Sequence, residues 1–149
     1  MEITIETASI RLLDKFFALE EQCFDQEAFT KRQISYLLTG YNTIALAAKT
    51  NNDVAGFIIT QIEIENEAAF GHIITINVAP KYRKKGIAKK MLKETEDLLK
   101  QKGIPECHLE VREDNSAALK LYQNSGYQKI GKLEKYYGRA NGLYFKKTL

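Results

Sequence analysis

Six basic residues lie at or near the N-terminus of one predicted helix, although a helix N-terminus favours carboxylates. An apolar stripe predicts this helix over residues 86–102, and the basic residues are Lys81, Arg83, Lys84, Lys85, Lys89 and Lys90. Unpaired N–H groups give a helix N-terminus roughly half a positive charge, which disfavours lysines at that end. A bound anion would resolve this conflict. The run Arg83–Ala88, with Gly86 leaving the backbone uncovered, therefore indicates a phosphate site. The alternative is a solvated basic face before an ordinary helix.

A carboxylate on the next predicted strand is the second candidate for chemistry. In strand 106–112 the residues Cys107, Leu109 and Val111 share one face, and His108, Glu110 and Arg112 share the other. A strand in a helix-covered parallel sheet should be apolar on both faces, so Glu110 either meets solvent, alone or paired with an arginine, or lines a cleft. The basic loop and the end of this strand both lie at the C-terminal ends of parallel strands. Ligands bind at that edge in open α/β sheets.

A helix predicted over 116–125 adds an amide and a phenol. Asn115 or Ser116 can cap its N-terminus, and the Asn115 amide can also bind a ligand. Tyr122 lies near the other end of this helix. Its spacing alone is that of a tyrosine packed in the core.

The elements that must position these residues follow from hydrophobic periodicity and turn signals. Ser9 is a plausible N-cap for the first helix. The predicted strands are 2–6, 43–49, 54–65, 69–78, 106–112, 127–135 and 142–148, and the predicted helices are 9–22, 30–38, 86–102 and 116–125. This order predicts an α/β fold with a mixed sheet, in which the strand–helix–strand unit over 70–112 makes two strands parallel.

Composition sets mild limits on function. The chain has 149 residues, 44% of them hydrophobic, which predicts one globular domain over 1–149. A net charge of +3 is too small to argue for nucleic acid, and no apolar run approaches the ~20 residues of a membrane span. Cys23 and Cys107 suit neither a metal motif nor a disulfide framework. They are expected to be free thiols in a reducing compartment, and the expected location is cytoplasmic.

Four motifs in order and spacing resemble the GNAT superfamily of acetyl-CoA-dependent N-acetyltransferases. They are Gly71–Val78, the Arg83–Ala88 loop, Leu109–Arg112 with Asn115, and Leu121-Tyr122 with Gly126-Tyr127. Within the superfamily they are similar to the N-terminal protein acetyltransferases, meaning the ribosomal-protein (RimI) type and the archaeal and eukaryotic Nα-acetyltransferases. The resemblance covers nearly the whole chain and is strongest over 70–137. It implies a mixed, mostly antiparallel sheet of about seven strands, with a central parallel pair and about four helices.

The resemblance also implies roles for individual residues. Glu110 would be the general base, acting through water, and Tyr122 the general acid. Backbone groups of Ile76, Asn77 and Val78 would pair with the pantetheine arm of acetyl-CoA and polarise its thioester. The other cofactor-binding residues would be Arg83, Lys84, Lys85, Gly86, Ile87, Ala88, Lys89 and Asn115. Phe29, Tyr136 and Tyr137 would form walls of the acceptor pocket; His72 is expected to be structural and His108 a bystander.

The expected acceptor is the N-terminal α-amine of a protein, for example a ribosomal or nascent chain. An α-amino group of pKa about 7.7–8.0 is roughly a tenth neutral at pH 7, whereas a lysine is only about 0.04% neutral, so a carboxylate acting through water could suffice for an N-terminus. The alternatives are a small amine or a lysine as acceptor, or a binding module that holds acetyl-CoA without transfer. The sequence does not indicate an oligomeric state.

Overall fold

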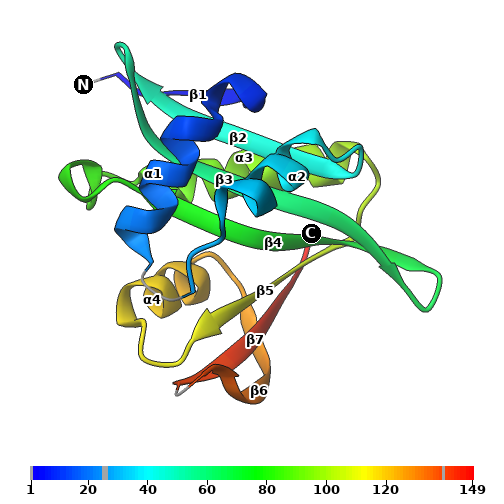
Figure 1. The fold of residues 1–149 in the computed structure, drawn as a ribbon. Coiled ribbons are helices and arrows are strands. Elements are labelled where there is room, and N and C mark those ends of the chain that lie inside the picture. The colour runs from blue at the N-terminus through cyan, green and yellow to red at the C-terminus, as the bar shows by residue number, and fades with distance from the viewer. Residues whose placement is uncertain (1, 25–26, 139) are drawn as a thin grey trace.

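A seven-stranded sheet organises the computed structural model, which describes residues 2–24, 27–138 and 140–149. The strand order is β1-β2-β3-β4-β5-β7-β6 (Figure 1). All neighbouring strands are antiparallel except β4 and β5, which are parallel. The strands are β1 (Thr4–Thr7), β2 (Thr43–Thr50), β3 (Asp53–Glu65), β4 (Ala68–Val78), β5 (Glu106–Arg112), β6 (Gln128–Tyr137) and β7 (Ala140–Thr148). The predicted fold class is confirmed.

Helices cover both faces of the sheet and form two hydrophobic clusters. Helices α1 (Leu13–Cys23) and α2 (Lys31–Thr39) pack on Phe57 and Ile59 of β3. Helices α3 (Ile87–Gln101) and α4 (Ser116–Asn124) contribute to the other cluster, with Ile58 and Ile73. Two short 3-10 helices, η1 (Ile10–Leu12) and η2 (Pro80–Tyr82), complete the chain. No helix in the described part of the chain combines the length and apolar character needed to cross a membrane.

Local signals explain where these helices begin. Ser9 caps η1 by accepting a hydrogen bond from the Arg11 N–H, as expected from its position before the predicted helix. Thr30 and Gln33 form a reciprocal capping box at the start of α2. Helix α3 has no such cap and no acidic residue in its first turn; it follows Gly86, whose φ is 77°.

Strands β4 and β5 separate after a short parallel contact. They pair only at Gly71–Cys107, His72–His108 and Ile73–Leu109, although β4 continues to Val78. Figure 1 shows β5 diverging from β4 towards α4. The final residues of β4 therefore pair with β3 on one side and with no strand on the other, which leaves backbone groups free to bind a ligand.

A β-bulge in β4 changes which side chains face each helix layer. The register with β3 shifts between Ile59 and Thr60, so Ile74 has no partner there. Ile73 and Ile76 pack with the α3 cluster, whereas Ile74 packs with the α1 and α2 cluster and Thr75 bonds to α1. The extra residue thus puts two consecutive side chains on the α1 side, against the simple alternation of a strand.

Candidate active site

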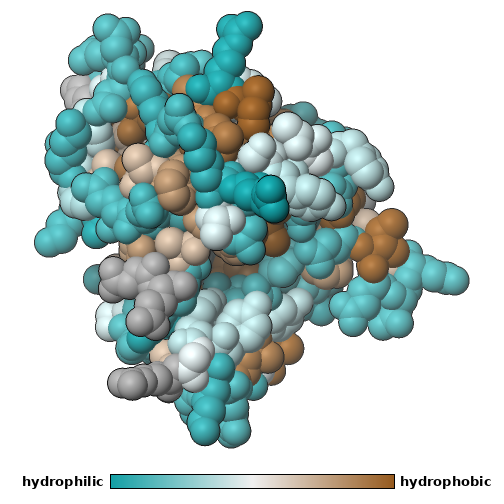
Figure 2. Space-filling view, viewed as in Figure 1, coloured by the Kyte–Doolittle hydropathy of each residue, from teal (hydrophilic) through white to brown (hydrophobic). Residues whose placement is uncertain are grey.

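A cavity of about 1090 Å³ opens where β4 and β5 separate. Residues from α1, α2, β3, the middle of β4, the end of β5, α4 and β6 line it. In space-filling view this face is hollowed between the α1–α2 half and the β6–β7 half (Figure 2). Seven of the predicted catalytic and binding residues line it: Phe29, Ile76, Glu110, Asn115, Tyr122, Tyr136 and Tyr137. Residues from distant parts of the chain thus meet in one place.

Glu110 is held by a histidine on the neighbouring strand. Its Oε1 lies 2.7 Å from Nε2 of His72, and Nδ1 of His72 lies 2.6 Å from Oε2 of Glu63 on β3. Burial disfavours a charged imidazole, but hydrogen bonds and charges from Glu110 and Glu63 outweigh it and raise the pKa of His72 to about 8. At neutral pH His72 is therefore mostly an imidazolium between two carboxylates.

The contact between His72 and the candidate base was not predicted from the sequence. His72 is expected there to be structural, and the structure places its Nε2 against Glu110. The parallel register pairs His72 with His108, and Glu110 follows two residues later on the same face of β5. The signal lay in that register, which local periodicity does not reveal.

A second histidine forms a separate network on the same sheet face. Nδ1 of His108 bonds to the Tyr144 hydroxyl and Nε2 lies 3.1 Å from Oε1 of Glu106, while Phe70 stacks on the imidazole at 4.1 Å. Burial and nearby carboxylates, Glu110 foremost, raise the pKa of Tyr144 to about 12. The hydrogen bonds of His108 are thus with Tyr144 and Glu106 and not with Glu110.

Tyr122 reaches the cavity from α4. The residue is 4% exposed, and its ring packs edge-on against Tyr127 with centroids 5.8 Å apart. Burial raises the pKa of its phenol, so the hydroxyl stays protonated at neutral pH. Among the described residues that hydroxyl has no hydrogen-bond partner, which leaves it available to a ligand.

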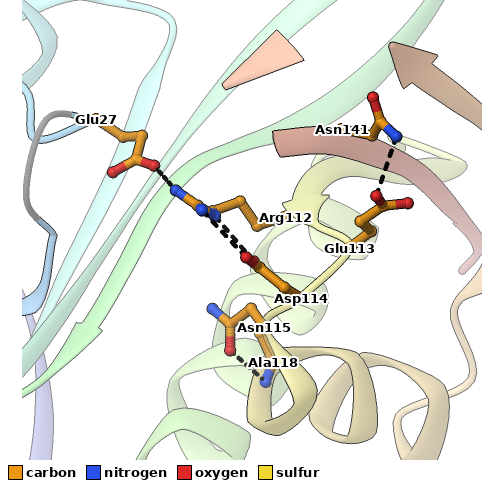
Figure 3. Close-up of polar contacts among 7 residues, drawn as sticks. All are labelled: Glu27, Arg112, Glu113, Asp114, Asn115, Ala118 and Asn141. Carbon is orange, nitrogen blue, oxygen red and sulfur yellow. Dashed lines mark hydrogen bonds and ion pairs between the residues drawn. The ribbon is translucent and has the colours of Figure 1, made fainter. Parts of the chain in front are cut away.

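Polar contacts tie the loops around the cavity together (Figure 3). Arg112, at the end of β5, bonds through Nε and Nη2 to Asp114 at 2.8 and 3.1 Å, and its Nη1 bonds to Glu27. Oδ1 of Asn115 accepts from the Ala118 N–H at 3.1 Å, which caps α4 and leaves the amide NH2 for another partner. Asp25 and Gln26, between α1 and α2, and Arg139, between β6 and β7, lie outside the described residues.

Glu20 is a buried carboxyl that links the two sides of the cavity, and sequence reasoning missed it. Although only 1% exposed, it accepts hydrogen bonds from the Thr75 hydroxyl at 2.8 Å, the Asn77 amide at 3.1 Å and the Phe29 N–H at 3.2 Å. Burial raises the pKa of Glu20, and these hydrogen bonds oppose the shift. The only signal was its place beside Phe16 and Leu19 on the buried face of a helix.

The basic loop has the backbone geometry expected of an anion site. Lys84 and Gly86 have φ of 63° and 77°. A Cβ at Gly86 would meet nothing within 4 Å. Glycine is therefore favoured here by the positive φ and not by a lack of space for a side chain. Lys84, Lys85 and Lys89 are exposed, and none of them forms an ion pair with a described residue.

Arg83 is oriented differently from these lysines. Its Nε donates to the Val78 carbonyl at 3.0 Å and its Nη2 lies 3.4 Å from Sγ of Cys23. Lys85, Gly86 and Ile87 line a smaller hollow of about 390 Å³, and none of the loop lines the large cavity. The loop lysines, the free N–H groups of α3 and the unpaired side of β4 fit a ligand that carries phosphates and an extended amide arm.

This fold and site belong to a known enzyme class. The family described as Acetyltransferase (GNAT) matches residues 9–127, and the chain belongs to this family. It is therefore an acetyl-CoA-dependent acyltransferase, with acetyl-CoA as the acetyl donor.

Two relatives and one solved structure show which members of the family this chain is similar to. The chain is 31% identical over 120 residues to the catalytic subunit NAA20 of the N-terminal acetyltransferase B complex from Arabidopsis thaliana, covering 78% of this chain and 68% of that protein. It is 32% identical over 92 residues to the [ribosomal protein bS18]-alanine N-acetyltransferase of Escherichia coli, and this alignment covers 62% of this chain and 60% of that protein. A chain in the crystal structure of the NatC complex bound to Gag peptide and CoA aligns with a TM-score of 0.89 and 25% identity, covering 100% and 99%. The predicted family and the predicted cosubstrate are confirmed.

Proposed function

We propose that this protein transfers the acetyl group of acetyl-CoA to the N-terminal α-amine of proteins, with Glu110 as general base and Tyr122 as general acid. The observation that carries the proposal is that Glu110 and Tyr122, which lie on different elements, line one cavity at the separation of β4 and β5. Relatives named for N-terminal acetylation support this choice of acceptor. Ribosomal and nascent chains are the proposed partners, and residues 1–149 are proposed to form one domain.

Acetyl-CoA supplies an activated thioester, and we propose that several groups of this chain hold it. Ile76, Asn77 and Val78 would pair through backbone groups with its pantetheine arm, because this end of β4 pairs with β3 on one side and with no described strand on the other. The exposed loop residues before α3 would bind the pyrophosphate: Lys84, Lys85, Gly86, Ile87, Ala88 and Lys89. The free Asn115 amide would contact the cofactor further along. Arg83 would contribute mainly through Val78, because its guanidinium bonds to that carbonyl.

The chemistry of the two side chains suits the proposed roles. A carboxylate at position 110 can accept a proton from the acceptor amine through water, and the α-amine needs little help because its own pKa is near neutrality. The buried phenol of Tyr122 keeps its proton and can donate it to the departing thiolate. Phe29, Tyr136 and Tyr137 would enclose the first residue of the acceptor; the two tyrosine rings pack edge-on at 4.9 Å.

A peptide panel tests the proposal. Peptides that begin with Ser, Ala, Thr, Met-Leu or Met-Glu, each with an internal lysine, would be incubated with acetyl-CoA beside spermidine, and products located by fragmentation mass spectrometry. We expect acetyl on the α-amine, strongly reduced in Glu110→Gln and unchanged in the exposed control Glu134→Gln. Acetyl on lysine or spermidine alone would overturn the acceptor class. Acetyl-CoA binding without any product would overturn catalysis and indicate a binding module.

A further inference from the structure

One buried carboxylate joins the segment that would hold the acceptor to the strand that would hold acetyl-CoA. Glu20, in the last turn of α1, is 1% exposed and lines the cavity. Its Oε1 accepts hydrogen bonds from the Thr75 hydroxyl at 2.8 Å and the Asn77 amide at 3.1 Å, both on β4. Its Oε2 accepts from the backbone N–H of Phe29, between α1 and α2, at 3.2 Å. The two oxygens of this carboxylate therefore bind two different parts of the site.

The section of β4 that Glu20 binds is the one proposed to receive acetyl-CoA. Thr75 and Asn77 alternate with Ile76 and Val78, beyond the last parallel pairing with β5. Figure 1 shows α1 lying across β4. The end of this helix contacts the section a second time, because Sγ of Cys23 donates to the Val78 carbonyl at 3.6 Å. A ligand that fixes this part of β4 would therefore also fix the hydrogen-bond donors of Glu20.

The other oxygen of Glu20 holds a proposed wall of the acceptor pocket. Phe29 lines the cavity but belongs to neither a helix nor a strand. Secondary structure therefore supplies no partner for its N–H, and Glu20 takes that place. The next residue, Thr30, begins the capping box of α2. The position of Phe29 relative to β4 thus depends on Glu20.

We propose that Glu20 couples the two substrate sites, so that binding of acetyl-CoA tightens binding of the acceptor. A cofactor that orders the end of β4 fixes Thr75 and Asn77, and Glu20 then holds Phe29 in the position that the acceptor requires. The effect must be reciprocal, with the acceptor tightening cofactor binding by the same factor. This inference rests on the proposed function. Glu20 acts through the protein groups that it binds, which makes it a positioning residue.

A glutamine at position 20 cuts the connection with little change in volume. Its amide has one oxygen and one NH2 group, so it can accept from β4 or from Phe29 but not from both. Glu20→Gln should therefore fold and bind each substrate alone, while the two sites become independent. Glu21→Gln, at the exposed next position of α1, is the matched control.

Calorimetry with CoA and an acceptor peptide measures the coupling without turnover, because CoA carries no acetyl group. We expect saturating CoA to lower the peptide Kd about 10-fold in the wild type and in Glu21→Gln, and less than twofold in Glu20→Gln. A merely structural defect would weaken peptide binding equally with and without CoA and leave this ratio unchanged. If a peptide that the enzyme acetylates shows no such ratio in the wild type, or keeps the full ratio in Glu20→Gln, the inference is wrong.

Hydrogen exchange at the Phe29 amide, followed by NMR, tests the coupling without an acceptor. Added CoA should slow this exchange about 10-fold in the wild type and have almost no effect in Glu20→Gln. Thr75→Val, which removes one β4 donor with little change of shape, should show a smaller slowing than the wild type and repeats the test if Glu20→Gln does not fold. A wild-type Phe29 amide that is insensitive to CoA, or a full response in Thr75→Val, would overturn the coupling. Acetylation of lysine or spermidine alone in the peptide panel would instead overturn the proposed acceptor.

Discussion

The charged state of His72 should make folding stability depend on pH in a definite direction. The carboxylates of Glu110 and Glu63 raise its pKa from 6.5 to about 8 in the folded protein. At about 1.4 kcal/mol for each tenfold change in proton affinity, this corresponds to about 2 kcal/mol. Because the folded-state pKa is the higher one, the contribution is fully present below pH 6.5 and is lost as the pH rises through about 8.

Chemical denaturation of wild type and His72→Gln at several pH values isolates this contribution. The measured quantity is the difference between their free energies of unfolding, which cancels groups that titrate alike in both proteins. We expect this difference to shrink by about 2 kcal/mol between about pH 5.5 and pH 9. A difference that stays constant, or grows with pH, would refute the imidazolium assignment.

Substitutions at three other residues test the site. Glu110→Gln should lower kcat by ~10²–10³ while calorimetry shows acetyl-CoA binding within twofold of wild type; a parallel loss of both would contradict the role of base. Tyr122→Phe should lower kcat about 10-fold or more and leave the melting temperature within a few degrees, because the hydroxyl bonds to no described residue; a large fall in melting temperature would instead assign the phenol to the core. Glu20→Ala should lower the free energy of unfolding in urea by about 2–4 kcal/mol, because Thr75, Asn77 and the Phe29 N–H lose their buried acceptor. Glu20→Gln should keep most of the stability. An Ala variant as stable as the wild type would contradict this role.

Much of the fold could be predicted because its signals are local. The apolar stripe of α3, the strand alternation of β5 and the turn residues between strands place every α-helix and strand within a few residues of its observed bounds. The start of the first helix differs in detail, since residues Ile10–Leu12 form a 3-10 turn before α1. The mixed sheet with one parallel pair was predictable for the same reason: a strand, a helix and a strand in succession return the chain in the same direction.

The candidate site was predictable only in part. Glu110 and the basic loop stood out because each breaks a local rule, and the resemblance added Tyr122 and the aromatic walls. Glu20 and Glu63 did not stand out, since a glutamate on a helix or an edge of a hairpin is ordinary by itself. Glu20 bonds to Thr75, 55 residues away in the chain, and Glu63 contacts His72, 9 residues away on the next strand.

The sequence alone determined the elements, the enzyme family and the identity of the residues with reactive groups, because propensity, periodicity and motif spacing act over short stretches of chain. The tertiary structure decided which of those groups meet. The separation of β4 from β5 created the cavity, the bulge at Ile74 directed Thr75 towards Glu20, and strand register set His72 between two carboxylates. Such arrangements depend on hydrogen bonds between distant strands, and a one-residue change of register would move these side chains to the opposite face.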